Sequence, residues 1–176
     1  MDILIIVVII IIGWILITYN AFITRKNKIK QARSSIDVYL TQRFELIPNL
    51  VECVKGYMKH EQIVLEKVSA LRSDYNKTKN LEAGAQLNRM CNSMIGLAEN
   101  APDLKANEQF MNLQKSLSKM ESQLQAARRL YNSEVTVYNT KIATIPTNLV
   151  AAIFRFREEA LFEAEAGAEK NIEIDL

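Results

Sequence analysis

The chain opens with a long apolar stretch that carries no charge. From Ile3 to Ile23 there are 21 such residues. At about 1.5 Å per residue, a helix of that length spans roughly 30 Å, which is the thickness of the hydrocarbon core of a bilayer. The stretch therefore predicts a transmembrane helix, and we expect residues 1–24 to form an N-terminal membrane anchor in a lipid bilayer.

Two kinds of processed segment also start with apolar residues, and neither fits. A secretory signal peptide needs a basic start, a shorter apolar run and a small-residue cleavage site. Here Asp2 stands at the start, and the run ends in the bulky residues Tyr19 and Phe22. A type IV pilin needs a Gly-Phe-like processing site ahead of its apolar helix, and none is present. We therefore expect the apolar segment to be retained.

Positive charge gathers just after the apolar stretch, whereas Asp2 is the only charged side chain before it. The positive-inside rule then places residues 25 onward in the cytoplasm and the short N-terminus outside the cell membrane. The opposite orientation, with an extracellular soluble part, is the alternative. Aromatic rings and the first cations are expected to mark the membrane interface. These residues are Trp14, Tyr19, Phe22, Arg25, Lys26 and Lys28.

Composition favours helices over sheets. The 176 residues include 5 Gly and 3 Pro, too few for the turns that a sheet requires. The formal net charge is +2, and no basic stripe with interleaved aromatics follows residue 33, so nucleic acid is not expected as a partner. Cys53 and Cys91 lack C-x-x-C spacing and are expected to be buried free thiols.

Apolar residues recur every three or four positions along most of the remaining chain. The first series continues out of the anchor through Ile29 and Leu40, which predicts one helix up to Pro48. Proline lacks the N–H of an interior helical bond, so we expect either a kink or a break there. Further helices are expected at about residues 48–77 and 87–98, the second ending before Pro102.

The longest regular pattern has heptad spacing, and Asp103 is the expected N-cap before it. Its period of about 3.5 residues predicts near-antiparallel packing, as in coiled coils and four-helix bundles. The seam consists of Phe110, Leu113, Leu117, Met120, Leu124, Ala127, Tyr131, Glu134 and Tyr138. After Pro146, a final helix capped by Thr147 or Asn148 is expected to run to about Ala164.

Together these segments predict an all-α fold. The N-terminal transmembrane helix is expected to continue into an antiparallel up-and-down helical bundle of the four-helix type. The bundle is expected over residues 25–164, and an acidic C-terminal tail over residues 165–176 is expected to stay solvated.

Charged residues fall on or beside the apolar seams. Polar residues in a seam mostly set register and pairing, so a structural role is expected for them. The alternative is a ligand site, which needs a pocket of several hundred Å³ where such groups converge. The candidate buried polar or structural residues are Asp37, Arg43, Glu61, Arg72, Glu121 and Arg128.

The usual catalytic and nucleotide-binding motifs are missing. His60-Glu61 begins the zinc motif H-E-x-x-H, but Val64 stands at the second histidine position and the chain has no other histidine. Cys53 and His60 would lie about 10 Å apart along a helix, beyond the reach of proton transfer. Neither glycine-rich phosphate-binding motif is present. We therefore expect no enzymatic activity, no cofactor and no metal.

Two stretches resemble the LemA family. The first runs from Ser35-Ile36-Asp37 through Leu46-Ile47-Pro48-Asn49-Leu50-Val51 to His60-Glu61, and the second contains Tyr131-Asn132, Tyr138-Asn139 and Ile145-Pro146-Thr147-Asn148. The resemblance covers roughly residues 13–157. Phe154-Arg155-Phe156-Arg157 departs from the family pattern, in which a glycine is expected beside the second aromatic residue. The resemblance implies a bacterial-type membrane protein with a helical cytoplasmic domain, and it supplies no catalytic residues.

Two functional hypotheses follow. The first is a membrane-anchored helical scaffold that acts at the inner membrane face, either by self-association into a homo-oligomer or by binding an unidentified protein partner. The second is a ligand sensor or an enzyme that uses buried Glu and Arg groups in the bundle.

Overall fold

The computed structural model describes residues 1–57, 61–78, 82–97 and 101–162. Within these ranges the chain forms helices and no strand, which confirms the predicted all-α fold. The acidic tail at residues 165–176 and His60 lie outside the described residues.

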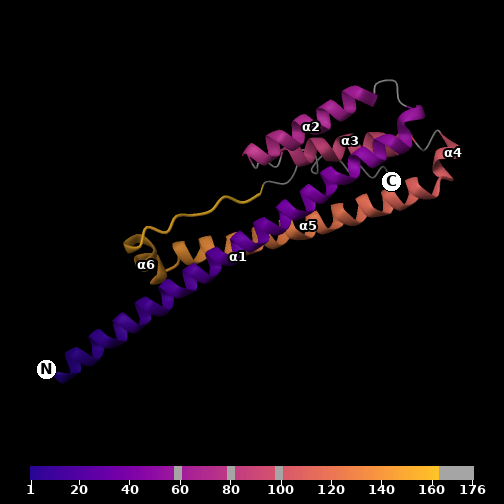
Figure 1. Ribbon diagram of the computed structural model, residues 1–176. Helices are drawn as coiled ribbons and strands as arrows, with labels where there is room; N and C mark the ends of the chain where they lie inside the picture. The colour runs from indigo at the N-terminus through magenta and orange to yellow at the C-terminus, as the bar shows by residue number, and fades with distance from the viewer. Residues whose placement is uncertain (58–60, 79–81, 98–100, 163–176) are drawn as a thin grey trace, which may run out of the picture. The chain divides into compact units, whose positions relative to one another are not determined.

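Six α-helices and one short 3₁₀ turn make up the described chain (Figure 1). They are α1 (Asp2–Val54), the 3₁₀ turn η1 (Lys55–Tyr57), α2 (Glu61–Thr78), α3 (Glu82–Leu97), α4 (Pro102–Lys105), α5 (Glu108–Ala143) and α6 (Thr147–Ile153).

The chain divides into two compact units. Unit 1 comprises Met1–Ser35 and Ala126–Leu176, and unit 2 comprises Ile36–Gln125. The long helices α1 and α5 therefore contribute to both units, and the predicted bundle region at residues 25–164 is shared between them.

In unit 2, α1, α2, α3 and α5 lie side by side (Figure 1), and each of them carries buried apolar side chains. The helical periodicity of the sequence predicts most of this core, because side chains three and four residues apart lie on one face of a helix. The largest fully buried members are Ile36, Leu40, Phe44, Ile47, Leu50, Tyr75, Leu87, Phe110, Leu117 and Leu124.

Polar contacts show that α1 and α2 run antiparallel in unit 2. The Tyr75 hydroxyl of α2 donates a hydrogen bond to the Asp37 carboxylate of α1. Further along α1, Glu45 lies 3.7 Å from Arg72, which precedes Tyr75 on α2. A later position on α1 thus meets an earlier position on α2.

The first helix ends at Val54 and not at Pro48, which corrects the predicted helix at residues 48–77. α1 contains Pro48 and ends at Val54, before the 3₁₀ turn that includes Gly56. An interior proline costs about 3 kcal/mol. Fully burying one aliphatic side chain contributes about 1.5–3 kcal/mol, and Ile47, Leu50, Val51 and Val54 are all buried. The burial outweighs the cost of the proline.

In unit 1, α1 and the second half of α5 also run antiparallel. The Phe22 and Tyr138 rings meet edge to face with centroids 6.0 Å apart. Arg25, one turn later on α1, donates a hydrogen bond of 2.9 Å to Glu134, one turn earlier on α5. Both helices therefore supply aromatic and charged side chains to the same interface.

Helix α6 ends at Ile153, well before the predicted Ala164. The backbone N–H groups of Arg155 and Phe156 donate to the Ala152 and Ala151 carbonyls, which is the hydrogen-bond pattern of a Schellman C-cap. Arg155 has a φ of 57°, a left-handed conformation that favours glycine. The departure from the LemA pattern at this point is therefore an arginine at a position suited to glycine.

Two predicted caps are also wrong. No side chain caps the N-terminus of α6. Instead, the Thr147 hydroxyl lies 2.6 Å from the Lys141 carbonyl near the end of α5. Asp103 lies inside the short helix α4, and Asn107 caps α5 by accepting hydrogen bonds from the N–H groups of Gln109 and Phe110.

Beyond α6, residues 156–162 form neither helix nor strand and run as an extended segment (Figure 1), which two asparagine side chains of α5 hold. The Asn139 amide accepts a hydrogen bond from the Glu159 N–H at 3.0 Å and donates one to the Glu159 carbonyl at 2.9 Å. Asn132 makes the same pair of bonds with Phe162, at 2.8 and 2.9 Å. Each asparagine thus satisfies both backbone groups of one residue, and we name this arrangement the asparagine clamp.

The spacing of the asparagine clamp follows from backbone geometry. Asn132 and Asn139 are seven residues apart, which is about 10 Å along a helix and returns to nearly the same face. Glu159 and Phe162 are three residues apart, which is also about 10 Å along an extended chain. The two Tyr-Asn dipeptides of α5, Tyr131-Asn132 and Tyr138-Asn139, therefore supply the two amides of the asparagine clamp.

Replacing either clamp asparagine with leucine should loosen the extended segment. Losing two hydrogen bonds to a half-buried backbone should destabilise unit 1 by about 1–3 kcal/mol. In hydrogen exchange, the Asn139→Leu variant should accelerate the Glu159 amide, and Asn132→Leu the Phe162 amide. Asn112→Leu, an exposed position on α5, is the matched control. Unchanged protection in both variants would contradict the clamp.

Replacing Arg155 with glycine should stabilise the protein. The left-handed conformation costs a non-glycine residue about 1–2 kcal/mol, so Arg155→Gly should raise the free energy of unfolding by roughly that amount. Arg157→Gly, in the extended segment, should give no such gain. Thermal denaturation of the two variants measures the difference. Equal changes in the free energy of unfolding would exclude strain at Arg155.

Candidate functional site

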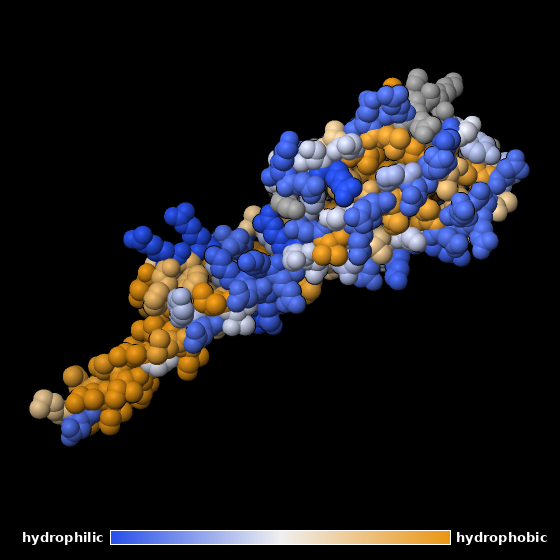
Figure 2. Space-filling model, in the orientation of Figure 1, coloured by the Kyte–Doolittle hydropathy of each residue, from blue (hydrophilic) through white to orange (hydrophobic). Residues whose placement is uncertain are grey.

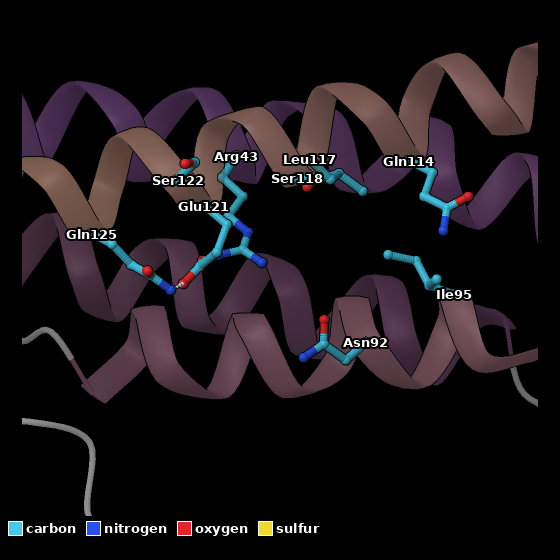
Figure 3. Close-up of a pocket in the computed structure, with 9 residues that line it drawn as sticks. All are labelled: Arg43, Asn92, Ile95, Gln114, Leu117, Ser118, Glu121, Ser122 and Gln125. Carbon is cyan, nitrogen blue, oxygen red and sulfur yellow. Dashed lines mark hydrogen bonds and ion pairs between the residues drawn. The ribbon is translucent and has the colours of Figure 1, made fainter. Parts of the chain in front are cut away.

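A polar cleft of about 520 Å³ lies in unit 2, and α1, α3 and α5 line it (Figure 3). Asn92 and Ile95 of α3 face the α5 side chains across the cleft, and Arg43 of α1 lies at its base. The remaining lining residues all come from α5. They are Gln114, Leu117, Ser118, Glu121, Ser122 and Gln125.

The α5 side of the cleft is a polar stripe beside the apolar seam. Gln114, Ser118, Glu121 and Gln125 follow one another at steps of four, three and four residues, which places them on one face of the helix. Their neighbours Leu117 and Leu124 are buried in the core. One helix therefore packs with one face and lines the cleft with the adjacent face.

An ion pair forms the charged end of the cleft. The Arg43 guanidinium, which is buried, donates a hydrogen bond to the Glu121 carboxylate. The other Glu121 oxygen accepts a hydrogen bond of 3.0 Å from Gln125 (Figure 3). Arg43 and Glu121 neutralise each other, so the cleft offers mainly amide and hydroxyl groups to a ligand or partner.

Cys91 lies fully buried beside this ion pair, whereas Cys53 is only half-buried. Both thiols are free, and the expectation of burial holds for Cys91 alone. Burial raises the pKa of the Cys91 thiol, and the nearby Arg43 guanidinium only partly offsets this effect. The Cys91 side chain is thus a protonated thiol at neutral pH, not an activated nucleophile.

The remaining charged seam residues do not converge on the cleft. Asp37 is half-buried and accepts the Tyr75 hydrogen bond. Arg72 is exposed, 3.7 Å from Glu45, so it is not the buried residue that the sequence predicts. Arg128 is half-buried in unit 1, and the side chain of Glu61 lies outside the described residues.

The predicted membrane-interface residues lie at one stretch of α1 in unit 1. Trp14 and Tyr19 are half-buried, and Lys26 and Lys28 are exposed. Arg25 pairs with Glu134 at 2.9 Å. Phe22 is 1% exposed and stacks on Phe156, so it packs in the protein interior and does not face the interface as predicted.

A second cleft, of about 380 Å³, lies in unit 1 just after the interface residues. Its charged lining consists of three cations of α1 (Lys26, Lys30 and Arg33) and Glu159 of the extended segment. The Tyr131 hydroxyl also lines it and donates a hydrogen bond of 3.1 Å to the Ala160 carbonyl. Burial raises the pKa of Tyr131, so this hydroxyl stays neutral at physiological pH.

Metal ligands do not gather in the part of the chain that the structure describes. No group of three or more His, Cys, Asp or Glu side chains there could hold a metal ion. The chemistry that both clefts offer is hydrogen bonding and charge recognition.

The sequence analysis missed most of the unit 2 cleft. It singled out Arg43 and Glu121 but not the neutral residues Gln114, Ser118 and Gln125. A signal was present, because these polar residues repeat at helical spacing one position away from the heptad seam. Which helix lies opposite that stripe depends on tertiary packing, so Asn92 and Ile95 carried no signal of their own.

Comparison with known proteins decides the family. The LemA family profile matches residues 32–176, which is most of the chain. The chain belongs to the LemA family. The matched region contains both charged residues of the unit 2 cleft and both asparagines of the clamp.

Three curated relatives are similar to the chain. Protein LemA of Metamycoplasma hominis is 29% identical over 150 residues, covering 82% of this chain and 68% of the relative. Magnetosome proteins MamQ 1 and MamQ 2 of Paramagnetospirillum magneticum are each 21% identical over 191 residues. In both cases the alignment covers 92% of this chain and 70% of the relative. None of these three names describes an enzyme.

The ion pair in the unit 2 cleft should show strong coupling. Glu121→Gln leaves the buried Arg43 charge without its counter-ion and should cost up to about 3–5 kcal/mol, an upper bound because Glu121 is partly exposed. Arg43→Met combined with Glu121→Met should recover much of that loss, because no charge is then left unpaired. Chemical denaturation of both single variants and the double variant measures the coupling.

The exposed pair of Arg72 and Glu45 is the matched control. Its coupling should stay below about 1 kcal/mol, since solvent screens exposed ion pairs. Equal coupling in the two pairs would mean that burial adds nothing at Arg43.

Proposed function

We propose that this protein is a membrane-anchored helical scaffold that acts through self-association or through binding of another protein. α1 crosses the cell membrane once, the short N-terminus lies outside, and unit 2 lies in the cytoplasm at the inner membrane face. The protein presents a helical binding surface at the inner membrane face and does not catalyse a reaction.

One observation carries the proposal. The first part of α1 is helical and exposes large apolar side chains at every position from Ile3 to Ile12, and again at Leu16 and Ile17. α1 is the one described helix long and apolar enough to cross a membrane. In water this surface would be costly, at about 25 cal/mol per Å² of exposed apolar area. A bilayer removes that cost.

The orientation rests on charge. Lys26, Lys28 and Lys30 follow the apolar helix and are exposed, whereas Asp2 precedes it. Positive residues beside a spanning helix favour the cytoplasmic side. Membership of the LemA family and similarity to the two MamQ proteins also support a membrane-associated role.

The surface proposed to bind a partner is the polar face of α5 in unit 2. The unit 2 cleft lies on this face, and a neighbouring hollow of about 560 Å³ is lined by Lys115, Lys119 and Gln123. Both hollows share the residues Gln114, Ser118 and Ser122, which form a ridge at steps of four residues. Ridges of this kind fit into the grooves of a second helix.

Photo-crosslinking in living cells tests the scaffold. A photo-reactive amino acid at Ser118 should give a discrete adduct with a second copy or with one other protein. The same photo-reactive amino acid placed at Lys67, an exposed position on α2, is the control and should give little adduct. Absence of any adduct from Ser118, together with a strictly monomeric protein at high concentration in detergent, would contradict the scaffold proposal.

Protease treatment of intact cells checks the orientation. The proposal expects unit 2 to be protected until the membrane is opened. Digestion of residues 25–176 from outside would instead place the helical units on the extracellular side.

A second candidate function is ligand sensing at the unit 2 cleft. The observation that favours it is the cleft volume of about 520 Å³ at the point where Arg43 and Glu121 meet. Ligand sensing predicts that Gln114→Ala and Ser118→Ala abolish function without changing the thermal midpoint, because both side chains face solvent. Full function in these variants would exclude it.

A further inference from the structure

The short helix α6 exposes an apolar face. Leu149 and Ile153 are 61% and 68% exposed and lie four residues apart, and Ile145, in the turn just before α6, is 78% exposed. Residues four apart on a helical turn point to the same side. The opposite side, Val150 and Ala151, is buried within unit 1. α6 therefore has two apolar faces, and the rest of unit 1 covers only one of them.

Ring contacts place the end of α6 beside the apolar part of α1. The Phe154 ring lies 4.8 Å from the Tyr19 ring, and the Phe156 ring lies 5.7 Å from it. Tyr19 belongs to the charge-free run, about 9 Å along the helix before Arg25, the first cation. The end of α6 thus lies level with the last turns of the apolar run of α1.

The apolar surfaces of α6 and α1 are continuous. Figure 2 shows hydrophobic surface over α6 that adjoins the hydrophobic surface of the first helix. Phe154, at the junction, is itself 45% exposed. A bilayer that surrounds α1 up to Tyr19 would therefore also meet Leu149 and Ile153.

Charge follows the same boundary. Arg155 and Arg157 come directly after α6 and are exposed. On the α1 side, Lys26, Lys30 and Arg33 line the unit 1 cleft. Cations just beyond an apolar surface suit the phosphate layer of anionic lipids, where each contributes favourable attraction.

We propose that α6 is a second membrane contact, whose exposed Leu149 and Ile153, together with Ile145 in the turn before the helix, insert into the interfacial layer of the bilayer that α1 spans. The occupant of this face is anionic phospholipid. This inference rests on the proposed membrane anchor and adds to it, because a spanning helix alone leaves unit 1 free to tilt. Two contacts hold unit 1 at a fixed height against the membrane.

Tryptophan quenching by brominated lipids tests the proposal with the full-length protein. The chain has a single tryptophan, Trp14, so Trp14→Phe gives a silent background. Leu149→Trp or Ile153→Trp is then introduced, and the protein is reconstituted into vesicles of phosphatidylcholine and phosphatidylglycerol. Bromines on the acyl chains near the headgroup should remove most of the emission from position 149 or 153, and aqueous iodide should remove little.

Two controls separate this inference from the anchor. Lys67→Trp, an exposed position on α2 in unit 2, should respond to iodide and not to the brominated lipid. The natural Trp14 reports the anchor, because brominated acyl chains should quench it if α1 spans. Quenching of Trp14 with iodide-accessible tryptophan at 149 and 153 would overturn the α6 contact alone. Failure to quench Trp14 would overturn the anchor itself.

Charge dependence gives a further outcome. With acrylamide, a neutral quencher that charged lipids do not repel, the tryptophan at position 149 should be more accessible in vesicles of phosphatidylcholine alone than in vesicles that contain phosphatidylglycerol. Equal access in both would exclude anionic headgroups from the contact.

Discussion

Apolar surface on α1 is the constraint on which the rest of the structure depends. From Ile3 to Ile12 that surface faces outward, and every side chain there is exposed. After Tyr19 the same helix turns its apolar side chains inward, first in unit 1 with Phe22 and Ile29 and then in unit 2 from Ile36 to Val54. One helix therefore buries apolar side chains in protein along its second part and presents an uncovered apolar surface, which we propose lipid covers, along its first part.

Polar groups then decide how each unit is completed. In unit 2, Arg43 and Glu121 neutralise each other within a packed core, so the cleft beside them presents amides and hydroxyls. In unit 1, the asparagine clamp satisfies the backbone of an extended segment that has no strand partner. Buried or half-buried polar groups need such partners, because leaving one unpaired costs about 1–3 kcal/mol. The same rule thus produces an ion pair in one unit and an amide clamp in the other.

Most of the core was predictable from periodicity, because burial of a helix face requires apolar residues every three or four positions. Phe110, Leu117 and Leu124 lie in the core as the heptad pattern indicates. Periodicity did not predict the end of α6, where the backbone groups make hydrogen bonds outside the helix. α6 stops at Ile153 because the Schellman cap and the asparagine clamp offer the next backbone groups other partners. The candidate site was only partly predictable, since Glu121 carried a signal and its neighbours across the cleft did not.

The sequence by itself determined the all-α class, the candidate anchor and the faces of the long helices, because these depend on local spacing and hydropathy. Tertiary structure alone decided that Arg43 pairs with Glu121 and that Phe22 packs inward. It also decided that Asn132 and Asn139 hydrogen-bond to the extended segment, 30 and 20 residues further along the chain. These outcomes depend on which helix lies opposite, and side-chain contacts between distant residues leave no period in the sequence. The exposure of α6 belongs to the same group, because its apolar residues alone do not say whether protein or lipid covers them.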